Sequence, residues 1–163
     1  MPLYRKIFPS FVWEDKKYVN QIIQQPKIVG AENLGFESGV PSEEIRKNDQ
    51  AIRRWIQEKM KICSCLVLFV GEDTWTSKWC RYEFDLAGEL GKGRLLVWLD
   101  GMTDPFYMFY TCGCGIDPLT AWGMNYDQRT GLILRKHWKT DNGQRYFANW
   151  IEIAISESRK ATW

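Results

Sequence analysis

The chain has 163 residues, a length that fits one domain over residues 1–163. Hydrophobic residues make up 45% and charged residues 26%, which excludes a disordered tail, a collagen-like repeat and a coiled coil. The formal net charge is only +2, so the composition gives no electrostatic case for a nucleic-acid or membrane partner.

The first part of the chain alternates predicted strands and helices. The first helix has Tyr18, Ile22 and Ile23 on one face and ends at Pro26, because proline disfavours helix in the residue before it. Three glycines and a proline then indicate a loop. The expected elements are a strand over residues 6–11, a helix over 15–25, a short strand at 28–29 and a loop over 30–41.

One amphipathic helix is expected after this loop. Ser42 is a candidate N-cap, and Glu43 and Glu44 favour the first turn. The apolar residues at helical spacing are Ile45, Ile52, Trp55, Ile56 and Met60. Basic residues are interleaved with acidic ones, so they indicate a solvated face. These basic residues are Arg46, Lys47, Arg53 and Arg54.

The middle of the chain predicts two buried strands and a second capped helix. Residues 66–70 and 95–99 are apolar at every position, which is typical of strands covered on both faces. Between them a helix starts near Thr76 or Ser77 and runs to Leu90, where Gly91 suits a left-handed C-cap.

The last third contains a long irregular segment over residues 102–130, followed by a strand at 132–134 and a helix over 144–159. The aromatic residues of the irregular segment form either a lid over a site or an ordinary packed loop, and no periodicity decides between the two. They are Tyr107, Phe109, Tyr110, Trp122 and Tyr126. The residues expected to face inward from the final helix are Phe147, Trp150, Ile151, Ala154 and Ile155.

The longest apolar run, residues 65–70, is much shorter than the about 20 residues of a membrane span. Residues 1–15 lack the pattern of a secretory signal, and an odd cysteine count then favours a reducing, cytoplasmic setting. The cysteines form two Cys-x-Cys pairs, Cys63 with Cys65 and Cys112 with Cys114. Structural zinc sites usually separate paired cysteines by two to four residues, so we expect no metal.

Buried strands alternating with amphipathic helices predict an α/β fold with a parallel sheet, in which ligands bind beyond the carboxyl ends of the strands. Trp79 and Glu83 lie one turn apart on one helix face there. The indole offers a stacking face, and the carboxylate could offset positive charge in a transition state. Spacing alone favours a plainer interpretation, in which Trp79 is core and Glu83 is solvated.

Two motifs shift that balance. Residues 7–11, IFPSF, resemble the first-strand box of TIR domains, and residues 77–83, SKWCRYE, resemble their serine-x-tryptophan-x-x-x-glutamate motif. The chain is similar over nearly its whole length to the TIR-like family of the prokaryotic Thoeris anti-phage system. The matching stretches are residues 52–56, 66–71, 74–79, 81–83, 138–143 and 150–152.

The resemblance implies a flavodoxin-like fold, with a mostly parallel five-stranded sheet and helices on both faces. TIR enzymes of this kind cleave the bond between nicotinamide and ribose in NAD⁺, so NAD⁺ is a substrate and no cofactor is expected. Thoeris TIR proteins then release an ADP-ribose-derived messenger, often cyclic, that activates an effector protein. The resemblance also implies a homo-oligomer through TIR–TIR contacts.

The same resemblance makes Glu83 the catalytic residue. The residues expected to bind substrate are Phe8, Ser10, Phe11, Trp13, Trp75, Ser77 and Trp79. Pro9 departs from many TIR domains and should bend or end the first strand. Two alternatives remain: a catalytically inactive TIR-like interaction module, or a nucleotide-processing α/β domain that shares only the fold.

The sequence leaves other candidates weaker. His137 is the single histidine, and a packing or surface role is favoured over catalysis because an orienting partner is not visible in sequence. Cys80 is expected to be a small buried residue. The tryptophans divide by position: Trp55, Trp98 and Trp150 are expected in the core, whereas Trp13, Trp75 and Trp79 follow strand ends, where a flat ring could stack.

Overall fold

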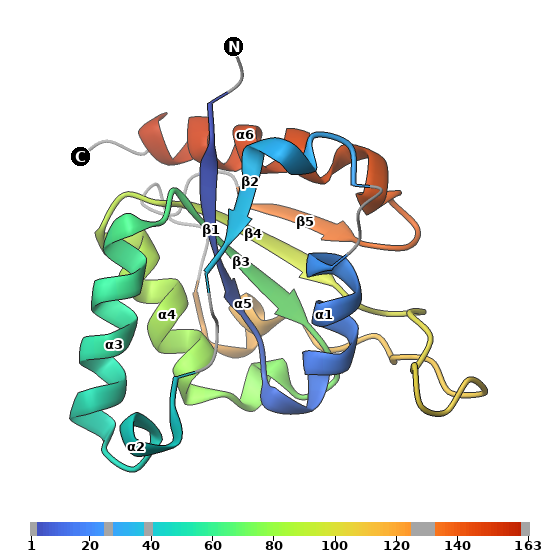
Figure 1. Cartoon of the computed structure of the whole chain (residues 1–163), viewed down its shortest axis with the longest axis horizontal. Helices are drawn as coiled ribbons and strands as arrows, with labels where there is room; N and C mark the ends of the chain where they lie inside the picture. Colours follow the sequence, from blue (N-terminus) through green and yellow to red (C-terminus); the bar gives the residue numbers. More distant parts are fainter. Residues whose placement is uncertain (1–2, 25–27, 38–40, 125–132, 161–163) are drawn as a thin grey trace.

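A computed structural model describes residues 3–24, 28–37, 41–124 and 133–160. Its centre is one five-stranded parallel sheet in the order β2-β1-β3-β4-β5 (Figure 1). This order is the flavodoxin-like doubly wound arrangement, so the predicted fold class is confirmed. The strands are β1 (Arg5–Ser10), β2 (Leu34–Phe36), β3 (Cys65–Val70), β4 (Gly93–Trp98) and β5 (Leu134–His137).

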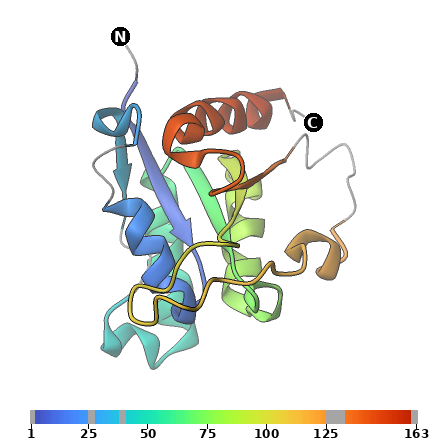
Figure 2. The same ribbon diagram turned by 90° about the vertical axis from the view of Figure 1, so that its right-hand side faces the viewer.

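Helices cover both faces of the sheet (Figures 1 and 2). On one face lie α1 (Lys16–Ile23) and α6 (Gly143–Lys160), and on the other lie α3 (Asp49–Ile62) and α4 (Lys78–Glu89). The remaining helices are short: η1 (Trp13–Asp15), η2 (Ala31–Asn33), α2 (Glu43–Arg46), η3 (Thr74–Thr76) and α5 (Pro118–Ala121). Within the described ranges no helix combines the length and the apolar character needed to cross a membrane.

Strand β3 is the centre of the core, and all six of its residues are buried. Successive side chains of a strand point to opposite faces. Val67 and Phe69 therefore join the apolar cluster under α1 and α6, while Leu66 and Leu68 join the cluster under α3 and α4. The continuous apolar run of the sequence is explained by this two-sided cover.

Strand β1 runs through Pro9 to Ser10, so the expectation that proline would bend or end it is wrong. Backbone groups along β1 alternate between its two neighbours. The carbonyl of Lys6 accepts from Ser64 beside β3, and the carbonyl of Ile7 accepts from Glu37 beside β2. Pro9 has the parity of Ile7 and faces the β2 side, where β2 has already ended at Phe36. The missing amide therefore breaks no ladder hydrogen bond.

Strand β2 lies inside the stretch predicted to be a loop, and the strand predicted at residues 28–29 is a turn. The amide of Val29 donates to the carbonyl of Gln144 at the start of α6, 3.0 Å away, instead of to a strand. Gly35 occupies the middle of β2, where a side chain would collide with the Tyr4 hydroxyl. A three-residue edge strand built around a glycine carries no apolar alternation, so its sequence resembles a loop.

The helix predicted from Ser42 is two helices, α2 and α3. Asn48 separates them in an extended conformation, and its side chain accepts from the amides of Gln50 and Ala51 at 2.9 and 3.3 Å. Ser42 precedes α2 but makes no capping hydrogen bond with its side chain. Apolar spacing continues across the break, and this explains why periodicity alone joined the two helices.

The later elements largely follow the sequence. The Ser77 hydroxyl caps α4 by accepting from the Cys80 amide at 3.2 Å, and Gly91 has a left-handed φ of 69°. All five residues predicted on the inner face of the last helix are buried in α6. The last strand begins at Leu134, two residues later than expected, and Pro26 and residue 132 lie outside the described ranges.

The segment predicted to be irregular contains α5 and one isolated antiparallel bridge, Thr103 with Thr111. Between these two residues the chain forms a tip whose five apolar side chains are exposed: Phe106, Tyr107, Met108, Phe109 and Tyr110. Asp104 holds the base of this tip, because its carboxylate accepts from two tip amides and pairs with Lys17. Tyr126 lies outside the described residues.

Replacing Asn48 with alanine should lower the free energy of unfolding by about 1 kcal/mol, because two amides of the first turn of α3 lose their acceptor. Urea unfolding of purified protein measures this change. Ser42→Ala is the matched control and should change stability by less than about 0.5 kcal/mol, since Ser42 makes no side-chain cap. Equal losses in the two variants would contradict the assignment of Asn48 as the cap.

Candidate active site around Glu83

A cavity of about 300 Å³ lies beyond the carboxyl end of β1, against α3 and α4. This position matches the switch point between β1 and β3, where flavodoxin-like sheets bind ligands. Four segments of the chain contribute to its wall. The lining residues are Phe11, Trp13, Pro41, Arg46, Ile52, Trp55, Ile56, Trp79 and Glu83.

Glu83 is the acidic group of the cavity, and only 7% of its surface is exposed. It lies on the inner face of α4, where the Ser10 hydroxyl at the end of β1 donates a hydrogen bond to its Oε2 at 2.5 Å. Burial raises the pKa of Glu83 to about 8, and the hydrogen bond from Ser10 acts in the opposite direction. This carboxyl group therefore changes its protonation state near neutral pH, whereas an ordinary surface glutamate is already ionised there.

The walls of the cavity are largely aromatic. Trp79 packs edge-on against Tyr82, with ring centroids 6.0 Å apart. Trp13 remains 54% exposed, and the Arg46 guanidinium lies 5.7 Å from its ring centroid. Trp55 packs edge-on against Phe8 at 6.2 Å. The site thus combines flat apolar surfaces, one buried carboxyl group and one cation.

The structure brings together some of the predicted site residues. The cavity is lined by Phe11, Trp13, Trp79 and Glu83. Ser10 is not part of the wall, but its hydroxyl donates a hydrogen bond to Glu83. Three of the predicted substrate-binding residues lie outside the cavity wall. Trp79 and Glu83, one helical turn apart on α4, both line this cavity. The plainer interpretation is wrong for Glu83, which is buried rather than solvated, whereas Trp79 does pack against the core cluster under α3 and α4.

Phe8, Trp75 and Ser77 do not line the cavity. Phe8 is completely buried in the core. Trp75 lies on η3 and is 38% exposed, and its carbonyl accepts from the Trp122 indole at 2.8 Å. Ser77 serves as the N-cap of α4. The structure therefore assigns none of these three residues to the wall of this cavity.

Sequence reasoning missed five wall residues: Pro41, Arg46, Ile52, Trp55 and Ile56. Arg46 ends the short helix α2 and is exposed, as expected for a solvated face, but it also lines the cavity. Trp55 was expected in the core, yet it is only partly buried and lines the cavity. The available signal was Asn48, a residue type that often caps helices. Recognising it as the start of α3 would have placed Arg46 on a separate, preceding segment. Trp98 and Trp150 are buried, as expected.

The aromatic residues of the irregular segment do not form a lid over the Glu83 cavity in this structure. Tyr107, Phe109 and Tyr110 are exposed and are absent from the wall of the Glu83 cavity. Trp122 packs against the core cluster under α4 and donates to Trp75. In the described residues these aromatics therefore form a protruding tip and a packed contact.

All five cysteines are free. Cys80 is buried beside the site, and burial raises the pKa of its thiol to about 12, as expected for an inert small residue. His137 does not line the Glu83 cavity. It stacks on Trp98, with ring centroids 5.4 Å apart.

The strand order and the tryptophan–glutamate pair on the helix after β3 define a TIR-like domain. The comparison with protein families agrees: residues 8–104 match the family described as "Thoeris protein ThsB, TIR-like domain". The chain therefore belongs to this family of an anti-phage defence system. No curated protein matches the chain.

Glu83→Gln should make the protein more stable at high pH. The pKa of Glu83 rises from 4.5 to about 8 on folding, so between these values the native state binds more protons than the unfolded state. Wild-type stability therefore falls as pH rises through this window, by about 5 kcal/mol in total at about 1.4 kcal/mol per pKa unit. A neutral glutamine of the same shape avoids this cost.

Chemical unfolding of both proteins at about pH 8 and about pH 4.5 measures the effect. The gain should be present at the higher pH and absent at the lower one. Glu89→Gln is the matched control, because it removes an exposed carboxylate from the same helix, and it should change stability by less than about 0.5 kcal/mol. A Glu83→Gln effect that is equal at both pH values would contradict the raised pKa.

Proposed function

We propose that this protein cleaves the bond between nicotinamide and ribose in NAD⁺, with Glu83 as the catalytic residue. The observation that carries the proposal is a buried carboxyl group in an aromatic-walled cavity at the switch point of a TIR-family sheet. We further propose that the product is an ADP-ribose-derived messenger, cyclic in form, that activates an effector protein during anti-phage defence.

The chemistry places positive charge next to Glu83. When the bond breaks, its electron pair leaves with the nicotinamide nitrogen, and the ribose carbon gains oxocarbenium character. An ionised carboxylate in a dry site stabilises that charge, as carboxylates do in glycoside hydrolysis. Water then adds and loses a proton to give ADP-ribose. If a nitrogen of the same molecule's adenine adds instead, the product is cyclic.

The wall of the cavity suggests how the substrate is held. The indole rings of Trp13, Trp55 and Trp79 provide flat surfaces on which nicotinamide can stack. A volume of about 300 Å³ is at the low end for ligand pockets, so we place the nicotinamide riboside end inside. Arg46 is then the cation available to the phosphates. NAD⁺ acts as a substrate in this scheme, with no cofactor.

The setting and the assembly of the protein are also proposals. Five free cysteines suit a reducing, cytoplasmic compartment. Self-association through TIR–TIR contacts is proposed from the family resemblance alone. A nucleic acid or a membrane is not expected as a partner, because the net charge is only +2.

Glu83→Gln should lower the rate of nicotinamide release by about 10²–10⁴-fold, because the ionised carboxylate is lost while its shape remains. Mass spectrometry of the products from NAD⁺, incubated with wild type and variant, measures the rate and separates ADP-ribose, a cyclic isomer and an adduct. Glu89→Gln is the control and should retain the wild-type rate. Unchanged turnover in Glu83→Gln would contradict the role of Glu83. If the wild-type protein releases no nicotinamide, even at high concentrations that favour self-association, the result would favour an inactive interaction module.

The pH dependence of kcat/KM should report the ionisation of Glu83. We expect kcat/KM to rise with pH and to level off above about 8, because the ionised form is the active one. Ser10→Ala should move the rising limb to higher pH, since the Ser10 hydrogen bond lowers the pKa of Glu83. Ser42→Ala is the control and should leave the limb in place. A limb that moves to lower pH in Ser10→Ala would contradict this coupling.

A further inference from the structure

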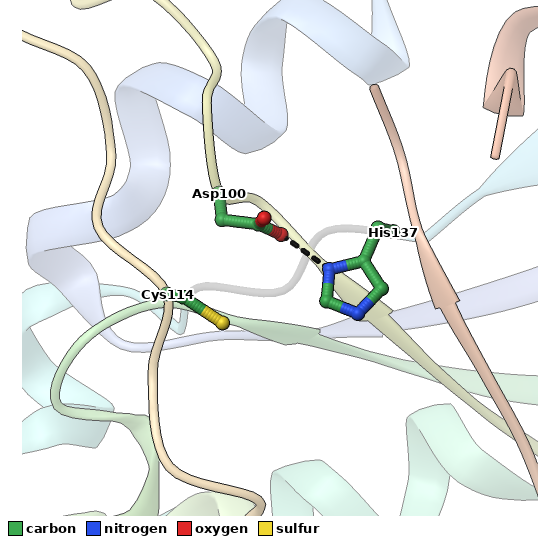
Figure 3. A group of neighbouring side chains, drawn as sticks. All are labelled: Asp100, Cys114 and His137. Atoms are coloured by element: carbon green, nitrogen blue, oxygen red, sulfur yellow. Dashed lines mark hydrogen bonds and ion pairs between the residues drawn. The ribbon is translucent and has the colours of Figure 1, made fainter. Parts of the chain in front are cut away.

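A second cluster of polar side chains lies beyond the carboxyl ends of β4 and β5. It consists of Asp100, Cys114 and His137 (Figure 3). One ligand atom from each residue lies within 4.8 Å of the other two, and no other such group of three occurs in the described part of the chain. None of the three lines the Glu83 cavity, so the cluster is a separate feature.

The sheet positions two of these residues. Trp98 ends β4 and lies opposite His137, which ends β5. Asp100 follows two residues after Trp98, so it projects from the same edge of the sheet as His137. The two side chains are joined by a hydrogen bond of 2.6 Å between Nδ1 of His137 and Oδ1 of Asp100. The imidazole ring is further fixed by stacking on Trp98.

The third residue arrives on a segment that returns from the aromatic tip. The amide of Gly101 donates to the carbonyl of Cys112 at 2.8 Å, and the Trp98 indole donates to the carbonyl of Gly115 at 2.9 Å. Cys114 is thus held between two anchored residues. Its Sγ points towards the Asp100–His137 pair in Figure 3, and Cys114 is the one exposed cysteine of the chain. An ion can therefore reach the cluster from solvent.

We propose that Asp100, Cys114 and His137 bind a zinc ion. A thiolate, an imidazole and a carboxylate are the donor types that zinc takes, whereas magnesium and calcium take oxygen donors. Bonds of about 2.0–2.3 Å in a tetrahedron place ligand atoms about 3.3–3.8 Å apart. The three donors reach this spacing by shifts of about 1 Å, and the fourth position holds water.

Binding replaces the hydrogen bond between Asp100 and His137 with two bonds to the ion. It also releases the thiol proton of Cys114, because zinc is bound by the thiolate. The result is a clip that joins the ends of β4 and β5 to the returning segment. This clip would fix the base of the aromatic tip, residues 106–110, against the sheet.

The proposal departs from the expectation of no metal, which rested on the spacing of the cysteine pairs. Only one member of a pair takes part. Cys112 is buried in the core cluster under α1 and α6, while Cys114 meets two residues that are distant in sequence. A search for paired cysteines does not find such a site, because its ligands come from three separate segments.

The test is a metal titration of the full chain after it has been stripped with a chelator. Zinc competition against a chromophoric chelator should give one site per chain, and zinc should raise the melting temperature. Cobalt substituted for zinc should give a thiolate charge-transfer band. Cys114→Ser should abolish that band, and both Cys114→Ser and His137→Gln should weaken zinc binding by about 100-fold or more. Cys112→Ala is the matched control and should keep both the band and the affinity.

Three results would overturn the proposal. The first is the lack of a saturable site in wild type, and the second is equal zinc affinity in wild type, Cys114→Ser and His137→Gln. The third is loss of the cobalt band in Cys112→Ala with retention in Cys114→Ser. None of these measurements uses NAD⁺, so they fail or succeed independently of the proposed catalytic function.

Discussion

The complete burial of β3 is the constraint on which the rest of this structure depends. Its backbone groups pair with β1 on one side and β4 on the other, and both of its faces are covered by apolar side chains. A parallel neighbour requires a crossover, so each connection must pass over a face and supply a helix. Both candidate sites lie beyond the carboxyl ends of the strands, where the connections of a parallel sheet can bring polar side chains together.

Glu83 shows how a buried carboxyl group opposes stability within this fold. Its helix packs on the sheet, so its inward face is the natural place for an apolar residue, and the chain places a carboxyl group there. Burial without an opposite charge disfavours the ionised form, and a single hydrogen bond from Ser10 offsets only part of this effect. Such a group lowers the stability of the folded state at high pH, and its place in a cavity makes it a candidate functional residue.

The two candidate sites differ in how the family match covers them. The matched residues, 8–104, include Glu83 and Asp100, whereas Cys114 and His137 lie beyond the match. The Glu83 cavity thus belongs to the part of the chain that defines the family. The proposed zinc ligands depend on the connection between β4 and β5 and on β5 itself. A zinc clip made by these residues would therefore lie largely outside the part of the chain that matches the family.

The sequence by itself determined the elements that bury a long apolar pattern. Strands β3 and β4 were predictable because each is a continuous apolar run. Helix α4 was predictable from its capping residues, and α6 from apolar residues at helical spacing. It also determined the pairing of Trp79 with Glu83, since two residues one turn apart must share a helix face. The family resemblance rested partly on these segments, because its matching stretches include residues of β3, α4 and α6, and partly on residues of β1 and α3.

Tertiary structure alone decided the short elements and the sites that are built from several segments of the chain. Strand β2 exists because β1 offers an edge to pair with, and Pro9 is tolerated because β2 ends before it. Arg46 and Trp55 became wall residues only when α2 and α3 were set against the end of β1. The cluster of Asp100, Cys114 and His137 likewise comes from three segments. Periodicity reports which face of one segment is buried, but a site built from several segments depends on how those segments pack, and no local pattern records that.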